Sequence, residues 1–310
     1  MRWLSKNLTI VIIVIALILG IGLMLYPTVS NYINSIRQAR AIVAYNDQLN
    51  GLTKEQCQQI LSRAKAYNKR LAKTGFNWEM SKSQKKDYES QLNINDIGMM
   101  GYVTIPKIRV KDPIYHGTNE GTLSSSIGHL EATSLPIGGK TTHCSITGHR
   151  GLPSARLFTD LDELKEGDTF TLTVLNHTVT YEIDQIHIVL PNNYKYLQLY
   201  QGKDYCTLIT CTPYGINTHR LLVRGHRIPN LDGAADVAAD ALQIRPMYIA
   251  PFIAIPFIIA LLIVYFWRGR RRKGVDLGPV ENYLSARGMT RPIFDLDRYD
   301  LVSAALNDRY

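Results

Sequence analysis

Three side chains in the C-terminal half of the chain, a thiol, a guanidinium and an imidazole, have a spacing that suits nucleophilic catalysis. Cys211 ends the apolar run "TLITC", and Arg220 begins the run "RLLVRG" nine positions later. A thiolate is a strong nucleophile, but a free cysteine is mostly thiol at neutral pH and needs a nearby cation. If the two runs are strands paired across one turn, Arg220 supplies that cation. A structural cysteine and a surface arginine would give the same pattern, so a third group is needed.

His149 is the candidate for that third group. It follows another strand-like run in a turn that has Gly148 before it and Gly151 after it, which suits a backbone that presents a side chain. An imidazole at this place can pair with a thiolate and later protonate a leaving amine. The other histidines favour surface or core roles, and none has metal-ligand spacing with the cysteines. We therefore expect no metal and no cofactor.

The elements that must position these groups are mainly β-strands. Alternating or apolar runs occupy residues 101–117, 141–149, 169–184, 204–211 and 219–228, and the third run reads as a hairpin that turns at Asn176-His177. Many short strands with turn signals between them predict a closed or nearly closed β-barrel. Residues 155–164 and 192–200 are expected to interrupt the barrel as helix-like turns.

Helical patterns precede the barrel. Residues 32–73 have apolar positions near helical spacing, interrupted at Gly51, after which Thr53 is expected to cap a second helix. A polar linker follows, and it carries two isolated aromatic residues, Phe76 and Trp78.

Both ends of the chain predict membrane association. The chain has 310 residues with a net charge of +9, and residues 8–26 and 247–267 are apolar and long enough to span a bilayer. Arg2 and Lys6 precede the first span without a following cleavage site, and a basic cluster follows the second, so both termini are expected in the cytoplasm. A buried soluble helix is the alternative for each span. The basic excess then marks topology, and nucleic-acid binding need not be invoked.

The expected organisation has seven parts, of which the central ones form one extracellular domain. They are a cytoplasmic N-terminus (1–7), an anchor (8–26), an extracellular helical segment with the linker (27–100), the barrel (101–230), a second linker (231–246), a transmembrane helix (247–267) and a cytoplasmic tail (268–310).

Four cysteines are too few for a disulfide scaffold, and no CxxC motif suggests zinc. Cys144 and Cys206 each lie five residues before a candidate catalytic residue, so their sulfurs come close if the two strands are parallel neighbours. Two buried free thiols are favoured over a disulfide. Cys57 lies on a predicted helix without a motif.

The segments "TLITCTPYGINTHRLLVRG" and "TGHRGLPSARLFTDLDEL" closely resemble the sortases, specifically the class C, pilus-assembling sortases of Gram-positive bacteria. The segments "MGYVTIPKI", "PIYHGT" and "GHLEATSLPIGG" extend the resemblance, which covers roughly residues 20 to 270. It implies a sortase-type barrel with N-terminal helices and two flanking transmembrane helices.

The resemblance also implies a cysteine transpeptidase that acts on pilin or surface-protein precursors. Cys211 would attack the Thr–Gly carbonyl of an LPXTG-like sorting signal and form a thioester, His149 would act as acid and then base, and Arg220 would hold the oxyanion or the substrate backbone. Thr210 and Thr212 would flank the substrate. A pilin lysine would then take the acyl group as an isopeptide. A sortase that anchors proteins to cell-wall peptide, a hydrolytic thiol protease and a non-enzymatic adhesin remain the alternatives.

Class C sortases resemble one another in a lid before the barrel, usually with an Asp-Pro-aromatic motif over the cysteine. The only Asp-Pro, Asp112-Pro113, lies in a predicted barrel strand. Phe76 and Trp78 are the best match to the lid, without its aspartate and proline, and we expect Trp78 to shield Cys211. The alternative is that both rings pack on the helical segment.

Overall fold

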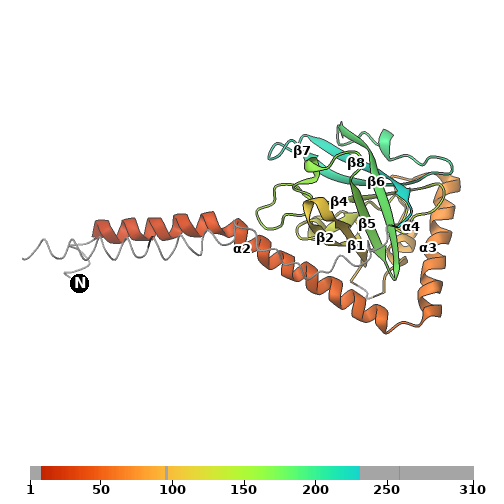
Figure 1. Cartoon of the computed structure of the whole chain (residues 1–310), viewed down its shortest axis with the longest axis horizontal. Coiled ribbons are helices and arrows are strands. Elements are labelled where there is room, and N and C mark those ends of the chain that lie inside the picture. The colour runs from red at the N-terminus through yellow and green to blue at the C-terminus, as the bar shows by residue number, and fades with distance from the viewer. Residues whose placement is uncertain (1–7, 95–96, 231–257, 259–310) are drawn as a thin grey trace, which may run out of the picture. The chain divides into compact units, whose positions relative to one another are not determined.

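Eight strands in the described part of the chain close into the predicted barrel (Figure 1). The computed structural model describes residues 8–94, 97–230 and 258. Neighbouring strands follow the order β1-β2-β3-β4-β7-β8-β6-β5, and β1 pairs with β5 to complete the ring. The strands are β1 Met99–Ile105, β2 Val110–His116, β3 Ile127–His129, β4 Thr142–Thr147, β5 Thr169–Val174, β6 His177–Val189, β7 Asp204–Thr212 and β8 His219–Ile228.

Helices precede the barrel and interrupt it in short pieces. The α-helices are α2 Leu8–Asn50, α3 Lys54–Thr74, α4 Lys82–Ser90 and α5 Glu120–Leu123, and the 3-10 helices are η1 Pro106–Ile108, η2 Leu161–Glu163 and η3 Lys195–Leu197. The two expected helix-like turns are thus confirmed as η2 and η3. Figure 1 shows α2 passing along the barrel before the chain turns into α3.

α2 is longer than the sequence predicts. The apolar stretch and the helix expected from residue 32 form one continuous helix that includes Pro27. In the described residues, α2 is the one helix long and apolar enough to cross a membrane. The second predicted span at residues 247–267, the linker before it and the tail after it lie outside the described residues.

The second half of α2 is fastened to the barrel by polar contacts. The Gln38 side-chain amide donates to the carbonyl of Ser125 at 2.9 Å. The Tyr45 hydroxyl donates to the carbonyl of Met100 and accepts from the amide of Leu175, both at 2.9 Å. All three bonds join residues far apart in sequence, so they fix this part of the helix against β1 and the β5–β6 hairpin.

The β5–β6 hairpin turns one residue earlier than predicted. Val174 pairs with His177, so the turn is Leu175–Asn176 rather than Asn176-His177. Leu175 adopts a positive φ of 53°. Its side chain is buried and its amide is bonded to Tyr45, and these contacts favour the turn at this position despite the cost of a left-handed conformation.

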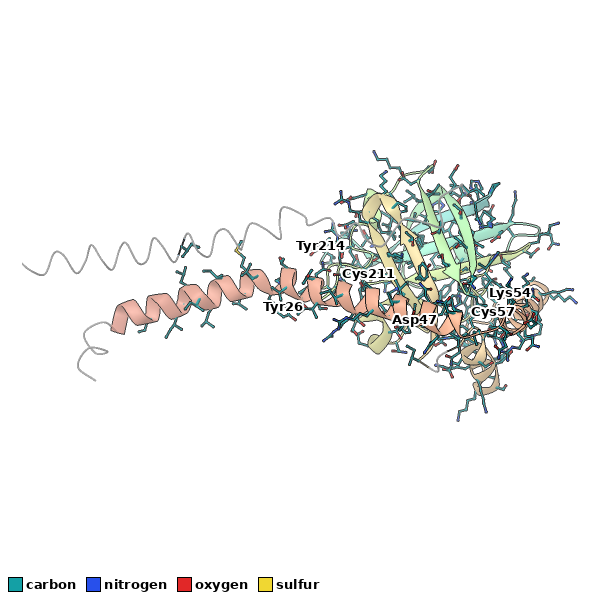
Figure 2. The ribbon with its side chains drawn as sticks, turned by 60° about the horizontal axis from the view of Figure 1, so that its bottom comes forward. Tyr26, Asp47, Lys54, Cys57, Cys211 and Tyr214 are labelled. Atoms are coloured by element: carbon teal, nitrogen blue, oxygen red, sulfur yellow. The ribbon has the colours of Figure 1, made fainter. Side chains whose placement is uncertain are left out.

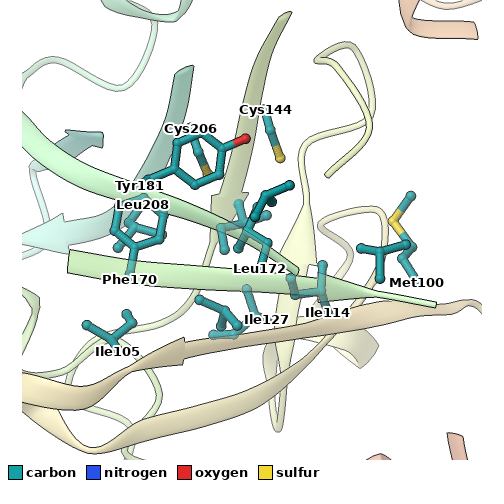
Figure 3. Close-up of a cluster of buried hydrophobic side chains, with 14 of the residues drawn as sticks. Met100, Ile105, Ile114, Ile127, Cys144, Phe170, Leu172, Tyr181, Cys206 and Leu208 are labelled. Carbon is teal, nitrogen blue, oxygen red and sulfur yellow. The ribbon is translucent and has the colours of Figure 1, made fainter. Parts of the chain in front are cut away.

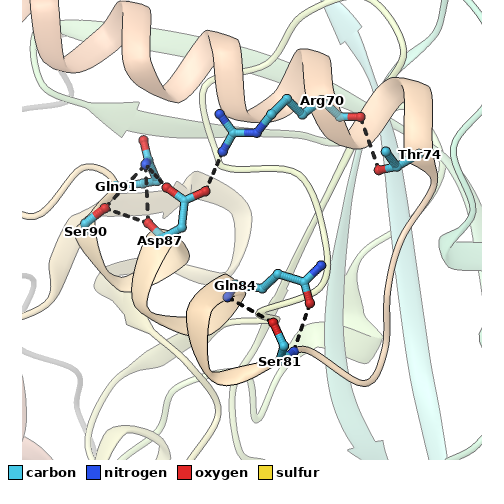
Figure 4. A network of polar contacts seen from close by, with 7 residues as sticks. All are labelled: Arg70, Thr74, Ser81, Gln84, Asp87, Ser90 and Gln91. Carbon is cyan, nitrogen blue, oxygen red and sulfur yellow. Dashed lines mark hydrogen bonds and ion pairs between the residues drawn. The ribbon is translucent and has the colours of Figure 1, made fainter.

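α3 and α4 begin at capping boxes and are tied together (Figure 4). Thr53 caps α3 as predicted. α4 lies in the segment interpreted as a polar linker, and the exchange of hydrogen bonds between Ser81 and Gln84 starts it. Arg70 on α3 forms an ion pair with Asp87 on α4.

The barrel interior holds the hydrophobic core (Figure 3). On β7, Leu208 and Thr210 lie on the face that points into the core and are almost fully buried, whereas Cys211 lies on the other face and is half-buried. β4 and β7 run parallel, and Cys144 lies directly opposite Cys206. The predicted proximity is confirmed, and both are buried free thiols. Burial raises the pKa of Cys206 well above its usual value.

Candidate active site

Cys211 and Arg220 face each other across the antiparallel pair of β7 and β8. They are direct register partners, two residues after the pair formed by Ile209 and Leu222 on the same face. Cys211 is a half-buried free thiol. The Arg220 guanidinium donates to the carbonyl of Asn217 at 3.2 Å and to that of His219 at 3.1 Å, so in this conformation it is bonded to its own turn.

His149 follows the end of β4, the parallel neighbour of β7 on its other side. Thr147 pairs with Ile209, and the Gly148 amide continues the ladder by donating to the Ile209 carbonyl at 3.1 Å. The Thr210 hydroxyl donates to the Gly148 carbonyl at 2.8 Å. Because parallel strands advance together, His149 comes next to the strand segment that carries Cys211. The three predicted residues therefore converge on one end of the barrel.

The glycine before the imidazole is required by packing. A Cβ on Gly148 would lie 2.6 Å from Cδ1 of Ile127 and 3.1 Å from the ring of Phe158. Neither neighbour has space to withdraw, because both are fully buried. The turn that presents His149 thus lies directly against the core.

Glu120 is a neighbour of His149 that sequence reasoning missed. Its Oε2 lies 3.8 Å from Nε2 of His149, which is too long for a hydrogen bond. The Glu120 side chain is 84% exposed, whereas that of His149 is 28% exposed. Glu120 is far from His149 in the sequence and lies on α5, and no sequence motif marks it.

Arg150 joins the two loops that border the site. It forms an ion pair with Asp162, donates to Thr212 Oγ1 at 3.4 Å, and lies over the ring of Tyr214 at 5.8 Å from its centre. Its side chain is only 9% exposed. Figure 2 places Tyr214 beside Cys211 at one end of the domain, away from the start of α3. Position next to His149 was the one sequence signal for Arg150.

Trp78 packs on the barrel beside the site. Its ring stacks on Tyr194 with 4.3 Å between centres, and Phe76 meets its edge. It also packs against a small cluster on the outer face of the barrel, made of Val189, Leu197, Ile209 and Leu222. Two members of this cluster are the register pair next to Cys211 and Arg220. Trp78 thus covers part of the barrel surface next to Cys211.

Comparison with known proteins agrees with this geometry. The family model described as the sortase domain matches residues 103–228. Sortase A of Staphylococcus aureus is 30% identical over 144 residues, which are 45% of this chain and 68% of that protein. The chain spans about three fifths of the length of other curated relatives that it matches, such as sortase A of Streptococcus agalactiae.

Solved structures give closer matches. The crystal structure of sortase C1 from Streptococcus agalactiae is 55% identical with a TM-score of 0.61, and covers 62% of this chain and 100% of that chain. Sortase C of Streptococcus pneumoniae is 41% identical with a TM-score of 0.56, and covers 62% and 97%. The chain therefore belongs to the sortase family. Within that family it is a class C sortase.

Proposed function

We propose that the protein is a cysteine transpeptidase in which Cys211 is the nucleophile. The observation that carries this proposal is the register of Cys211 with Arg220, combined with the turn that brings His149 to the same end of the barrel. The Cys211 thiolate adds to the Thr–Gly carbonyl of an LPXTG-like sorting signal. Arg220, once turned from its carbonyl partners toward the substrate, stabilises the oxyanion or holds the peptide backbone.

His149 moves the protons in both halves of the reaction. Collapse of the tetrahedral intermediate breaks the Thr–Gly bond, and the protonated imidazole gives its proton to the departing glycine amine. The acyl group remains on Cys211 as a thioester. The neutral imidazole then takes a proton from the incoming amine, which attacks the thioester and releases the thiolate. The thioester conserves the energy of the cleaved amide, so no nucleoside triphosphate is required.

The acceptor in the proposed reaction is a lysine amine on a pilin subunit, so that the product is an isopeptide bond between subunits. Membership of class C supports this acceptor. Mass spectrometry of the protein mixed with an LPXTG-type peptide tests the first half. An acyl adduct on Cys211 that is absent from Cys211→Ala is the expected result, and an adduct elsewhere would contradict the assignment.

Competition between acceptors tests the second half. A pilin lysine, a cell-wall peptide amine and water are offered to the acyl-enzyme together, and the products are counted. Predominant wall-peptide product would indicate an anchoring sortase, whereas hydrolysis at saturating pilin would indicate a thiol protease. Full function in Cys211→Ala would indicate a non-enzymatic adhesin.

The setting of the site completes the proposal. Residues 8–26 anchor the chain, with the domain outside, and residues 247–267 form a second span, with both termini in the cytoplasm. Trp78, with Phe76 at its edge, acts as a lid. Its stacking on Tyr194 and its contact with the cluster next to Cys211 support that role.

A further inference from the structure

A cavity lies at the end of the barrel opposite Cys211. It has a volume of about 660 Å³, within the usual range for ligand sites. One wall is the face of α3 that carries Lys65, Lys69 and Lys73. The other walls are the loop before β4, the starts of β6 and β7, and the end of β8, which contributes Arg227.

The cavity is strongly positive. Its lining has five cationic side chains, namely Lys65, Lys69, Lys73, Lys140 and Arg227, and within the described ranges none of them forms an ion pair. Like charges gathered on one surface without partners favour an anionic ligand.

The one acid in the lining, Asp204, interacts electrostatically with Arg227 and leaves the four lysines without an ion-pair partner among the described residues. Asp204 accepts from the Gly139 amide at 2.7 Å, from the Tyr181 hydroxyl at 3.0 Å and from the Thr142 hydroxyl at 3.1 Å. Its carboxylate is thus occupied in holding the wall together. The pKa of His177 is lowered by burial and, next, by Arg227 and Lys65, so this side chain responds to the positive potential around it.

The walls are held in place before any ligand arrives. Asn68, on the cavity face of α3, donates to the Leu135 carbonyl at 3.1 Å and accepts from the Leu135 amide at 2.8 Å. Both residues are buried. These two hydrogen bonds fix the helix that carries the lysine row against the barrel. The entropy cost of ordering the site when a ligand binds is therefore lower.

We propose that this cavity is a binding site for an acidic peptide segment of a protein substrate. Lys65, Lys69 and Lys73 recur every four residues, about 6 Å apart along the helix. Side chains on one face of an extended peptide recur at about 6.6 Å, so its carboxylates match this row. Apolar walls at Ile137 and Val179 suit the aliphatic parts of a peptide better than a chain of phosphates.

The site is separate from the thiol and rests on the proposed function, which supplies the protein substrates. β7 begins at Asp204 in the cavity and reaches Cys211 seven residues later, a span on the order of 23 Å. A short sorting peptide bound at Cys211 does not reach that far. A whole protein substrate is long enough to place an acidic segment in the cavity while its sorting signal lies at the thiol.

Binding is measured with the full chain in detergent micelles and a fluorescent peptide of alternating glutamate and serine. The double variant Lys69→Gln/Lys73→Gln removes two cavity charges. The matched control Lys54→Gln/Lys82→Gln makes the same charge change on α3 and α4 outside the cavity. We expect Kd to rise about tenfold in the first variant and to change less than about twofold in the control.

Several results would overturn the site. One is an equal loss of affinity for the acidic peptide in the cavity variant and in the control variant. Another is a glutamine–serine peptide that binds as tightly as the glutamate–serine peptide. A third is binding of inorganic polyphosphate without binding of the acidic peptide. The chain also carries Asp232, Asp236 and Asp240 after β8. If the peptide binds only after these three are changed to Asn, the chain fills the cavity itself and the proposal is wrong.

Turnover separates this proposal from the proposed function. Lys69→Gln/Lys73→Gln is expected to raise KM for a whole pilin subunit and to leave cleavage of a short sorting peptide unchanged. An unchanged KM for the whole subunit would refute the substrate role. If the wild-type chain cleaves no sorting peptide, the transpeptidase assignment fails, while the direct binding measurement still decides whether the cavity takes an acidic peptide.

Discussion

Asp112 places a carboxyl group inside the barrel, and its replacement by Asn should stabilise the protein in a strongly pH-dependent way. Asp112 lies on β2 opposite Val103, and Ile114 follows on the same face. Its side chain is buried, and burial raises its pKa from 3.8 to about 7. Asn has nearly the same shape and cannot ionise, so the substitution isolates the cost of the charge.

The sign and the size follow from proton linkage. Between pH 3.8 and about 7 the folded chain keeps the Asp112 proton, whereas the unfolded chain releases it. The free energy of unfolding therefore falls by about 1.4 kcal/mol for each pH unit in this window. Over the whole window the loss reaches about 4 kcal/mol, and it stays constant above it. Asp112→Asn lacks this loss.

Urea denaturation of the full chain in micelles, followed by tryptophan fluorescence, measures the effect at pH 4 and pH 8. We expect the gain of Asp112→Asn over wild type to be close to zero at pH 4 and about 4 kcal/mol at pH 8. The exposed Asp47 on α2 gives the matched control, because Asp47→Asn makes the same substitution outside the barrel interior. An equal gain from Asp112→Asn at the two pH values would refute the reasoning.

Three further substitutions test the site and its supports. Arg220→Lys keeps the charge but loses the planar fork, and should lower kcat/KM for a sorting peptide by about a hundredfold with the fold retained. Near-normal activity would mean that Arg220 contributes only its positive charge and no directed hydrogen bonds. Trp78→Ala should speed thiol labelling at Cys211 several-fold, with the other cysteines replaced, and equal rates would exclude a lid. Thr53→Ala should lower the free energy of unfolding by about 1 kcal/mol because it removes the cap of α3, and an unchanged urea midpoint would contradict this.

The strand character of the barrel was readable because its segments alternate or are rich in β-branched residues. The facing of Cys211 and Arg220 was predictable too, since two strands joined by a short turn pair in antiparallel fashion. The sequence could not establish the parallel pairing of β4 with β7, which entered only as an assumption about Cys144 and Cys206. Strands far apart in sequence carry no local signal of which strand they pair with. That pairing is what brings His149 to the thiol.

Other features were missed for identifiable reasons. α4 has a capping box at Ser81 and Gln84, a signal that was present in the sequence but lies in a segment poor in apolar residues. Glu120 comes next to His149 through the packing of α5 on β3, and its sequence has no special pattern. Lys69 and Arg227 line the same basic cavity although they are far apart in the sequence, so only the folded chain shows that they are neighbours.

The unbroken course of α2 has a consequence for orientation. The helix continues from its apolar stretch through Pro27 to Tyr45, where hydrogen bonds fix it to the barrel, so no loop separates the two. Each helical residue turns the chain by about 100° and advances it by about 1.5 Å. The number of residues between the apolar stretch and Gln38 thus sets the direction in which Cys211 faces, measured as a rotation about the axis of that stretch. Adding one residue would turn the thiol by more than a quarter of a circle with hardly any change in height.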